Sequence, residues 1–365
     1  MKILHVITSL ELGGAEKLLV DIVNLQREKG EDVDVLVLYD KENVFSINSI
    51  TSKYNSKTSY KNIFEILSVI KKGDYDIVHT HLTHAQFWTS LASFLDCTQI
   101  CKCGKKKRRY ITSEHSTYNN RREKAVFKII EKILYKRYEK VLCITKAVQD
   151  TLVKWLDDKN LDRYPIIDNG VNLNVFSHAT PIPRESLGVT SEDRVITMVA
   201  RLNKAKDHET LLNAMTLLPK KYKLLLVGEG DKREVLEKLS AELRLGDRVK
   251  FLGVRTDISN ILKTSDIAVQ SSHYEGFGIA AVEAMAAGIP LLGSDVEGLR
   301  DTIKGAGTLF NKGDSKELAK KILAIDALDD KSSIIEKQKV KAEEYSLEKS
   351  VDKYLKLYKE VVSGG

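Results

Sequence analysis

Residues 271–290 read Ser-Ser-His-Tyr-Glu-Gly-Phe-Gly-Ile-Ala-Ala-Val-Glu-Ala-Met-Ala-Ala-Gly-Ile-Pro and combine a glycine-rich turn with an alanine-rich helix. The apolar run Ile267–Gln270 before them predicts a strand, and Pro290–Gly293 predicts the next one. The helix is expected to begin at about Ile279 and to end at Gly288. Small alanines allow such a helix to pack closely on a sheet. The stretch therefore predicts a strand–helix–strand unit of a parallel α/β sheet.

Two carboxylates flank the start of this helix. Glu275 precedes the turn Gly276-Phe277-Gly278, and Glu283 lies on the second helical turn. A carboxylate accepts hydrogen bonds from neighbouring sugar hydroxyls, one with each oxygen. The amides of a helix N-terminus favour an anion. The spacing Glu-x7-Glu thus predicts a site for a ligand that carries both a sugar and a phosphate.

The same alternation of apolar strands and amphipathic helices runs through the whole chain. It breaks at Asp168–Asn174, a turn-rich segment close to Pro165, Pro181 and Pro183. The sequence predicts an α/β protein of two Rossmann-like domains, residues 1–172 and 173–345, with a final amphipathic helix in 346–365. Strands are expected at Ile3–Ile7, Asp34–Leu38, Ile77–Thr80, Tyr110–Thr112, Lys140–Ile144, Val195–Ala200, Lys223–Val227 and Val249–Leu252. Because ligands bind at the carboxyl ends of parallel strands, the crevice between the two sheets is the expected ligand site.

Two cations follow the first strand of the second domain. Arg201 and Lys206 lie five residues apart in Val199-Ala-Arg-Leu-Asn-Lys-Ala-Lys206. Such a pair can neutralise the charge that builds on a departing diphosphate. The alternative interpretation is a solvated loop, to which Lys204 is assigned.

Two features of the first domain are weaker candidates. Gly13-Gly14 follows the first strand and opens a helix, where glycine lets a ligand approach the backbone; a plain turn is the alternative. His115 follows another expected strand, and a lone histidine in that position is more often structural.

Clusters of histidine and cysteine raise the question of a metal. His79, His81 and His84 form His-x-His-x2-His, and Cys97, Cys101 and Cys103 form Cys-x3-Cys-x-Cys. The cysteine spacing matches no recurring zinc pattern. The cysteines are interpreted as reduced thiols and the histidines as cleft-lining or core residues, so no metal is expected.

The net charge of +7, from 58 Lys and Arg against 51 Asp and Glu, is concentrated in one segment. Residues 102–146 hold 15 Lys and Arg against four acids, a net +11. The segment includes Lys105–Arg109 and a helix with lysines at every fourth position. It predicts contact with an anionic membrane or a lipid-diphosphate acceptor; a merely solvated surface is the alternative. No nucleic-acid-binding motif accompanies it, and nucleic acid is not an expected partner.

No segment resembles a secretory signal, and no run of 18 apolar residues is present. The sequence therefore predicts a cytoplasmic protein, associated with the inner face of the plasma membrane if the basic segment contacts lipid.

Taken together, these motifs resemble the family-4 retaining glycosyltransferases of the GT-B fold, of the bacterial glycan-biosynthesis type. The resemblance spans the chain and rests on Glu275-x7-Glu283, Arg201-x4-Lys206, Gly228-Glu-Gly230, Phe251-Leu-Gly253 and Gly13-Gly14-Ala-Glu. It implies two domains facing a deep cleft, with the N-terminal domain binding the acceptor and the C-terminal domain binding the nucleotide sugar. It also implies that the final helix crosses back onto the first domain.

The resemblance assigns roles by position. Glu283 would hold the ribose hydroxyls, and Glu275 a hydroxyl of the transferred sugar. Arg201 and Lys206 would grip the diphosphate, and His115 would lie against the donor sugar, although Ser116 replaces the family's usual Asp. The backbone positions implied in donor binding are Gly14, Gly276, Phe277, Gly278, Val254 and Arg255.

The implied activity is metal-independent, retaining transfer of a hexose-type sugar from a nucleotide-diphosphate sugar, with UDP chosen on family frequency. The acceptor would be a glycan or a lipid-linked sugar in bacterial surface polysaccharide synthesis, and no cofactor is expected. The alternative is a nucleotide-sugar epimerase, or another enzyme of this fold that uses no glycan acceptor.

Overall fold

The computed structural model describes residues 1–11, 13–41, 44–96, 107–117, 122 and 124–364. The chain divides into two compact units. Unit 1 comprises Met1–Gly170 with Leu347–Gly365, and unit 2 comprises Val171–Ser346. The last helix therefore belongs to unit 1, although unit 2 separates it from the rest of that unit in the sequence. The expected domain limits, after residues 172 and 345, lie within two residues of these boundaries.

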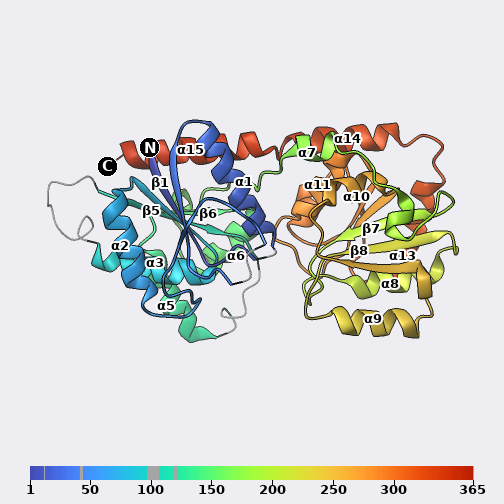
Figure 1. Cartoon of the computed structure of the whole chain (residues 1–365), viewed down its shortest axis with the longest axis horizontal. Helices are drawn as coiled ribbons and strands as arrows, with labels where there is room; N and C mark the ends of the chain where they lie inside the picture. Colours follow the sequence, from blue (N-terminus) through green and yellow to red (C-terminus); the bar gives the residue numbers. More distant parts are fainter. Residues whose placement is uncertain (12, 42–43, 97–106, 118–121, 123, 365) are drawn as a thin grey trace. The chain divides into compact units, whose positions relative to one another are not determined.

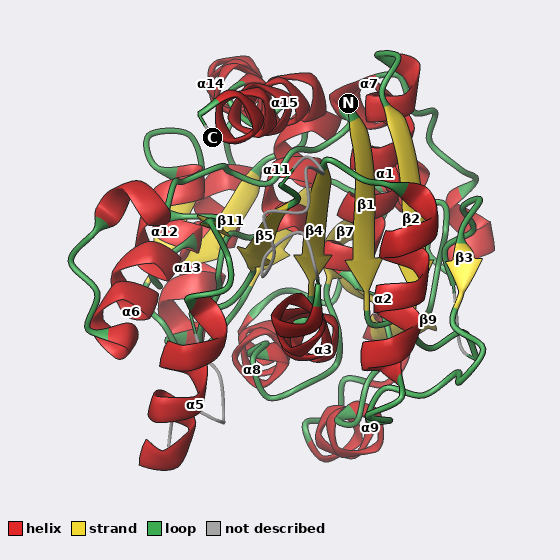
Figure 2. Cartoon of the chain, turned by 90° about the vertical axis from the view of Figure 1, so that its left-hand side faces the viewer, coloured by secondary structure: helices red, strands yellow, loops and turns green. Residues whose placement is uncertain are grey.

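Unit 1 is built on a parallel sheet in the strand order β3-β2-β1-β4-β5-β6. Figure 2 shows several of these strands side by side, with α1 lying against β1 and β2. The strands are β1 (Lys2–Ile7), β2 (Asp32–Val37), β3 (Ile50–Thr51), β4 (Ile77–His81), β5 (Arg109–Glu114) and β6 (Lys140–Cys143). The helices are α1 (Gly14–Glu28), α2 (Asn62–Gly73), α3 (Thr83–Leu95), α5 (Ala125–Tyr135), α6 (Lys146–Leu156) and α15 (Leu347–Ser363).

The core of unit 1 explains why the chain end returns to it. One face of α15 repeats apolar residues at helical spacing and buries Val351, Tyr354 and Tyr358 against α1 and the sheet. Figure 1 shows this helix, in red, beside α1, in blue. Burying those large side chains stabilises the helix where propensity alone would not.

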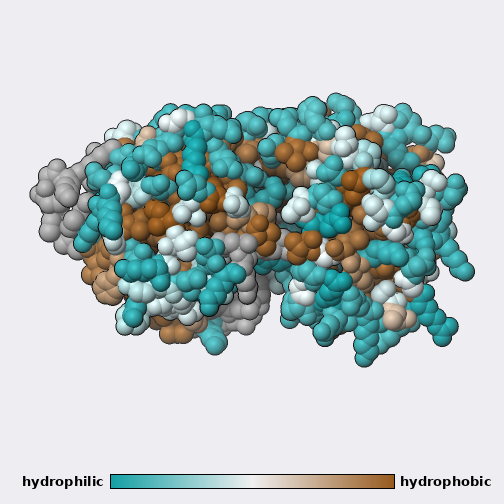
Figure 3. All heavy atoms as spheres, viewed as in Figure 1, coloured by the Kyte–Doolittle hydropathy of each residue, from teal (hydrophilic) through white to brown (hydrophobic). Residues whose placement is uncertain are grey.

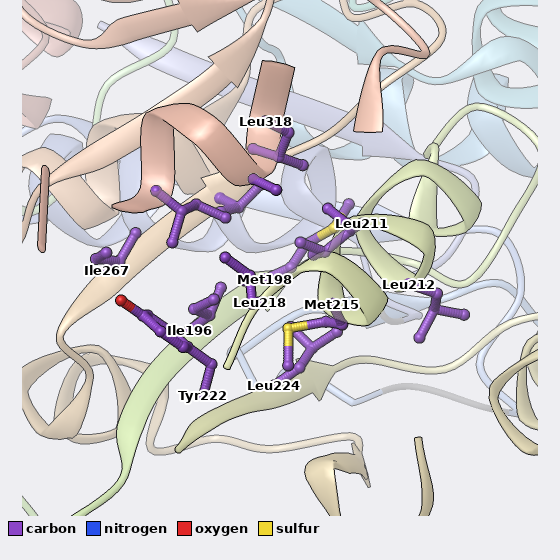
Figure 4. Close-up of a cluster of buried hydrophobic side chains, with 14 of the residues drawn as sticks. Ile196, Met198, Leu211, Leu212, Met215, Leu218, Tyr222, Leu224, Ile267 and Leu318 are labelled. Carbon is purple, nitrogen blue, oxygen red and sulfur yellow. The ribbon is translucent and has the colours of Figure 1, made fainter. Parts of the chain in front are cut away.

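Unit 2 repeats the architecture with a parallel sheet in the order β12-β11-β10-β7-β8-β9. Its strands are β7 (Arg194–Val199), β8 (Tyr222–Val227), β9 (Val249–Gly253), β10 (Ile267–Gln270), β11 (Leu291–Ser294) and β12 (Thr308–Phe310). Its helices are α7 (Leu173–Ser177), α8 (His208–Leu217), α9 (Arg233–Glu242), α10 (Ile258–Thr264), α11 (Ile279–Ala287), α12 (Leu299–Ile303), α13 (Ser315–Asp326) and α14 (Ser332–Glu343). Figure 4 shows Met198, Leu211 and Leu224 among the side chains that pack one face of this sheet.

The predicted class, two Rossmann-like α/β units with parallel sheets, is confirmed. Ten of the twelve described strands were predicted, since they are short and largely buried apolar runs. The sequence analysis missed the strands β3 and β12 and the helices α6, α7, α12, α13 and α14.

Strand order sets where each sheet can bind a ligand. In unit 1 successive strands are added on one side of β1 as far as β3 and then on its other side from β4 onward, so the switch point lies between β1 and β4. In unit 2 the corresponding switch point lies between β7 and β10. At such a switch point the loops leaving two neighbouring strands diverge to opposite faces and leave a crevice. The loops after β7 and β10 carry Arg201, Lys206 and Glu275.

Candidate active site

The loops after β7 and β10 are joined through their backbones. Lys206 forms an isolated antiparallel bridge with Ser272, the amide of His273 donates to the carbonyl of Ala205 at 2.9 Å, and the amide of Asp207 donates to Ser271 at 3.1 Å. This pairing places the Lys206 ammonium in an ion pair with the Glu275 carboxylate. Their side chains are 17% and 15% exposed, so the pair lies at a partly desolvated surface where charge interactions are stronger than in water.

The backbone of the Glu275 loop packs directly against Gly298. This glycine has a φ of +78°, and a Cβ on it would lie 2.4 Å from the carbonyl oxygen of Glu275. The Thr302 hydroxyl donates to the carbonyl of Phe277 at 2.7 Å, and the Phe277 ring is buried edge-on against Tyr345. The Phe277 side chain is therefore a core anchor, and only its backbone is available to a ligand.

The helix α11 begins and ends as predicted. Gly278, at a φ of +92°, precedes its first residue, and Gly288, at +75°, follows its last. Glu283 lies on the second turn and is 6% exposed. Four alanines of this helix are also buried, which is the close packing that its composition predicted.

The glycines of Gly228-Glu-Gly230 allow the Arg201 loop to lie directly on the end of β8. A Cβ on Gly228 would meet the carbonyl oxygen of Ala200 at 2.2 Å, and one on Gly230 would meet that of Leu202 at 2.3 Å. The Leu202 amide donates to Glu229 at 3.0 Å. Arg201 is exposed between these anchored neighbours. The motif thus positions the cationic loop through its backbone.

Replacing Gly230 with alanine is expected to push the Leu202 backbone away and to misplace Arg201 and Lys206. A steric insertion of this kind costs about 1–3 kcal/mol of stability. The expected result is a large loss of sugar-transfer activity with a moderate loss in urea unfolding. As a control, Gly305→Ala meets no atom within 4 Å and adds only left-handed backbone strain, so activity should persist. Full activity in Gly230→Ala would contradict this role.

The two residues expected near a nucleotide base follow β9. Val254 is 43% exposed, and the Arg255 guanidinium forms a two-pronged ion pair with Asp257 at 2.6 and 2.8 Å. The Arg255 side chain is therefore engaged in holding its own turn, which leaves the backbone as the part that a base could meet.

In unit 1, Gly14 is the first residue of α1 and is exposed. The first helical hydrogen bond of α1 already involves the residue before Gly14, since the Lys17 amide donates to the Gly13 carbonyl at 3.1 Å. Leu12 lies outside the described residues. The structure thus places Gly14 at the carboxyl edge of the sheet, after β1.

His115 follows β5 at the same edge and is half-buried, and both of its ring nitrogens are buried without a hydrogen bond to the described part of the chain. Burial lowers its pKa to about 4, so the imidazole is neutral at pH 7. The preceding residue, Glu114, accepts from Gln86 at 2.9 Å, from Arg122 at 3.2 Å and from Tyr135. This network fixes the end of β5 and with it the backbone of His115.

A row of histidines that the sequence analysis only partly recognised lies beneath His115. His5 and His79 are register partners on β1 and β4, and His81 shares their face of the sheet. His5 donates through Nε2 to Gln26 at 2.9 Å, so its Nδ1 accepts from His81 Nε2 at 2.9 Å. His79 bonds Tyr358 at 2.5 Å and Ser113 at 2.8 Å.

This cluster decides between the two interpretations of His79 and His81. Both are core residues, at most 2% exposed. Together with His5, they are also the one group of the described chain whose nitrogens lie close enough to share an ion, within 4.8 Å, and His84 is not part of it. The hydrogen bonds described above join the ring nitrogens of these histidines to one another or to side chains of the protein. The sequence analysis missed His5. Its place could have been inferred from the strand period, because His5 lies on the same face of β1 as Ile3 and Ile7, once the β1–β4 register was known.

Part of the expected basic surface is internal. Arg108 is 4% exposed and pairs with the fully buried Asp96 at 2.8 Å, while Arg109 pairs with Glu139 at 2.9 Å. The prediction that all of Lys105–Arg109 faces an anion is wrong for these two residues, because both guanidiniums are neutralised inside unit 1. Lys105, Lys106 and the cysteines Cys97, Cys101 and Cys103 lie outside the described residues.

Comparison with known families matches both units. Residues 180–349 match the model described as "Glycosyl transferases group 1", and residues 12–175 match "Glycosyltransferase Family 4". No helix of the described chain is long and apolar enough to cross a bilayer.

Individual relatives agree with these models. The chain is 28% identical over 303 residues to an uncharacterized glycosyltransferase of Methanocaldococcus jannaschii, covering 75% of each chain. It is 26% identical to the Escherichia coli UDP-Gal:alpha-D-GlcNAc-diphosphoundecaprenol alpha-1,3-galactosyltransferase, covering 78% of this chain and 74% of that one. Among solved structures, Anabaena Alr3699/HepE, crystallised with UDP and glucose, has a TM-score of 0.83 at 22% identity and covers 99% of this chain and 100% of its own.

Proposed function

The chain belongs to the family-4 glycosyltransferases of the GT-B fold, and from this premise we propose that it transfers a hexose-type sugar from a UDP-sugar, with retention, to a glycan or lipid-linked acceptor of bacterial surface polysaccharide. The observation that carries the proposal is the Lys206–Glu275 pair at the switch point of unit 2, beside α11. This ion pair holds together a cation that would bind the diphosphate, Lys206, and a carboxylate that would bind sugar hydroxyls, Glu275.

The donor would lie along the N-terminus of α11. Glu283 would accept hydrogen bonds from the ribose hydroxyls, and Glu275 from a hydroxyl of the transferred sugar. The amides of Gly276, Phe277 and Gly278 would line the sugar and phosphates, and the backbone at Val254 and Arg255 would meet the base. Phe277 and Arg255 are assigned through their backbones, because the Phe277 side chain is buried and the Arg255 side chain is paired with Asp257.

The chemistry would take place at the sugar's anomeric carbon. As the bond to the diphosphate breaks, Arg201 and Lys206 would neutralise the charge on the leaving oxygen, which is the contribution that a divalent cation makes in other transferases. The acceptor hydroxyl would attack on the face that the diphosphate leaves and give its proton to that diphosphate. Glu275 binds hydroxyls in this scheme and is not a nucleophile.

In unit 1, the family resemblance assigns donor contacts to two residues. The amide of Gly14 would donate to a donor phosphate, and His115, neutral and without a hydrogen-bond partner in the described chain, would lie against the donor sugar. A neutral imidazole in that position can accept or donate one hydrogen bond to a sugar hydroxyl.

Two of the similar proteins support the choice of UDP and of a lipid-linked acceptor. One was crystallised with UDP and glucose, and the other is named for UDP-Gal and a diphosphoundecaprenol acceptor. Such an acceptor lies in a membrane, so we place the protein at the inner face of the plasma membrane, in contact with anionic lipid through the basic residues of 102–146 other than Arg108 and Arg109, which are paired inside unit 1.

Nucleotide release separates this proposal from the epimerase alternative. The purified protein is incubated with UDP-, GDP- and ADP-sugars, with and without a bacterial lipid extract. The proposal expects UDP release that the extract accelerates and a glycolipid product with retained anomeric configuration. An epimerase would alter the sugar without any extract, and failure to bind every nucleotide sugar would reject the enzyme.

A further inference from the structure

The Lys206–Glu275 pair joins two groups that the proposed function assigns to different parts of the donor. In the described chain, Glu275 is the only ion-pair partner of the Lys206 ammonium. The proposed function places this ammonium on the diphosphate and the carboxylate on a sugar hydroxyl. Each charge is therefore satisfied by the other, and a donor that binds as proposed has to separate them.

The contacts of the Glu275 carboxylate leave one of its oxygens open. The Lys206 ammonium and the Ser272 hydroxyl, the latter at 3.4 Å, both donate to Oε2. No hydrogen bond from the described residues ends on Oε1. A sugar hydroxyl can bind to Oε1 and begin to replace the lysine before the ion pair is broken.

The backbone holds both partners of the pair in place. Lys206 bridges to Ser272, and the Ser272 amide donates to the Ser294 hydroxyl of β11 at 2.8 Å. Ser272 and Ser294 are fully buried. We therefore expect a ligand to change which group the Lys206 ammonium contacts, and not to move the two loops.

The surroundings of the pair give its charges more weight than those of a surface pair. Its side chains are 17% and 15% exposed, whereas those of the Lys238–Glu242 pair on α9 are 80% and 61% exposed. In Figure 3, teal spheres cover the lower edge of unit 2, where Figure 1 labels α9. Water screens the α9 pair, so its contribution is small. Leaving one charge of the Lys206–Glu275 pair without a partner costs more, because less water is there to replace it.

We propose that Glu275 sequesters Lys206 and thereby makes the site distinguish the intact donor from its nucleotide product. A sugar hydroxyl takes the place of the ammonium on Glu275, and Lys206 is released to the diphosphate. UDP alone brings no such hydroxyl, so Lys206 remains shared between the diphosphate and the carboxylate. The inference rests on the proposed function, from which it takes the donor and the roles of both residues.

The same exchange favours release of the product. After the sugar has been transferred, no hydroxyl remains on Glu275, and its carboxylate draws the ammonium away from UDP. The carboxylate then also lies beside the diphosphate, where like charges repel. UDP is thus held by less positive charge than the intact donor, and Lys206 matters less for UDP affinity than for turnover.

The test is calorimetric titration of the full chain with UDP and with uridine. Glu275→Gln keeps the size of the side chain but removes its charge, so it frees Lys206 for the diphosphate. We expect this variant to bind UDP about tenfold more tightly than the wild type does. Uridine has no phosphate, so its affinity should not change. An unchanged or weaker affinity of Glu275→Gln for UDP would overturn the proposal.

A double variant shows whether the gain in UDP affinity passes through Lys206. In the Lys206→Ala background, Glu275→Gln has no ammonium to free and should tighten UDP binding by less than about threefold. A full tenfold gain in that background would mean that the carboxylate acts by repulsion alone, and sequestration of the lysine would be rejected.

The intact donor provides the second half of the test. The donor used is the UDP-sugar from which the wild type releases most UDP in the assay given above. Glu275→Gln should bind this UDP-sugar no more tightly than the wild type does, because the variant loses a charged acceptor for the sugar hydroxyl. An equal tenfold gain for UDP and for the UDP-sugar would show that Glu275 does not distinguish them.

The matched control is Glu242→Gln, which breaks the exposed Lys–Glu pair on α9 and should leave UDP affinity at the wild-type value. The outcomes separate this inference from the proposed function. If the wild type binds no UDP, the proposed function fails and the inference fails with it. If the wild type binds UDP and transfers sugar while Glu275→Gln binds UDP as the wild type does, only the inference fails.

Discussion

Replacing Lys206 with alanine is expected to lower turnover by about 100- to 1,000-fold while the dissociation constant for UDP changes by less than about tenfold. The reason is that a cation aimed at the leaving diphosphate acts mostly where negative charge develops, which is in the transition state. Lys206 is held for this by the backbone bridge to Ser272 and by its contact with Glu275. The measurement is UDP release from the donor sugar together with calorimetric titration of UDP.

The matched control for this prediction is Lys204→Ala in the same loop. Lys204 is exposed two residues earlier and has no assigned role, so its removal should leave both quantities near their wild-type values. Equal losses of turnover and of UDP affinity in Lys206→Ala would mean that the lysine binds ground state and transition state alike. That outcome would reject its proposed part in departure of the nucleotide.

Unit 1 is expected to lose about 3–5 kcal/mol of stability between pH 7 and pH 5.5 because of its buried histidines. Burial lowers the pKa of His5 and His115 to about 4, and the pKa values of His79 and His81 also lie well below the usual range. In the unfolded chain each imidazole titrates near 6.5, at about 1.4 kcal/mol per pH unit below that. The unfolded state therefore binds more protons, and stability falls from about pH 6.5 towards pH 4.

Tryptophan fluorescence can follow this loss in unit 1 alone, because the chain's two tryptophans, Trp88 and Trp155, both belong to that unit. Urea unfolding is measured at several pH values. The double variant His5→Gln, His81→Gln should show a shallower pH dependence, whereas His178→Gln, an exposed residue of unit 2, should not change it. A stability that stays constant from pH 7 to pH 5.5 would show that these imidazoles remain neutral on unfolding or are charged when folded.

The sequence predicted the candidate donor site more fully than the rest. The turn at Glu275, the helix from Ile279 and its stop at Gly288 all lie where local pattern placed them, since glycine, alanine and proline act on their own backbone. The same local logic failed for His5, Arg108 and Arg109. Their surroundings come from residues more than ten positions away, such as Asp96 and His81, which no local pattern reveals.

Local patterns of residues were enough to predict the two parallel α/β sheets, the family and the residues expected at the donor site, because buried strands, helix stops and spaced carboxylates are local signals. Which charges are available could be seen only in the folded chain. There, Arg108 and Arg109 are buried in ion pairs, and Lys206 is joined to Glu275 across two loops. Burial and pairing depend on neighbours that strand order brings together, and strand order is a property of the folded chain.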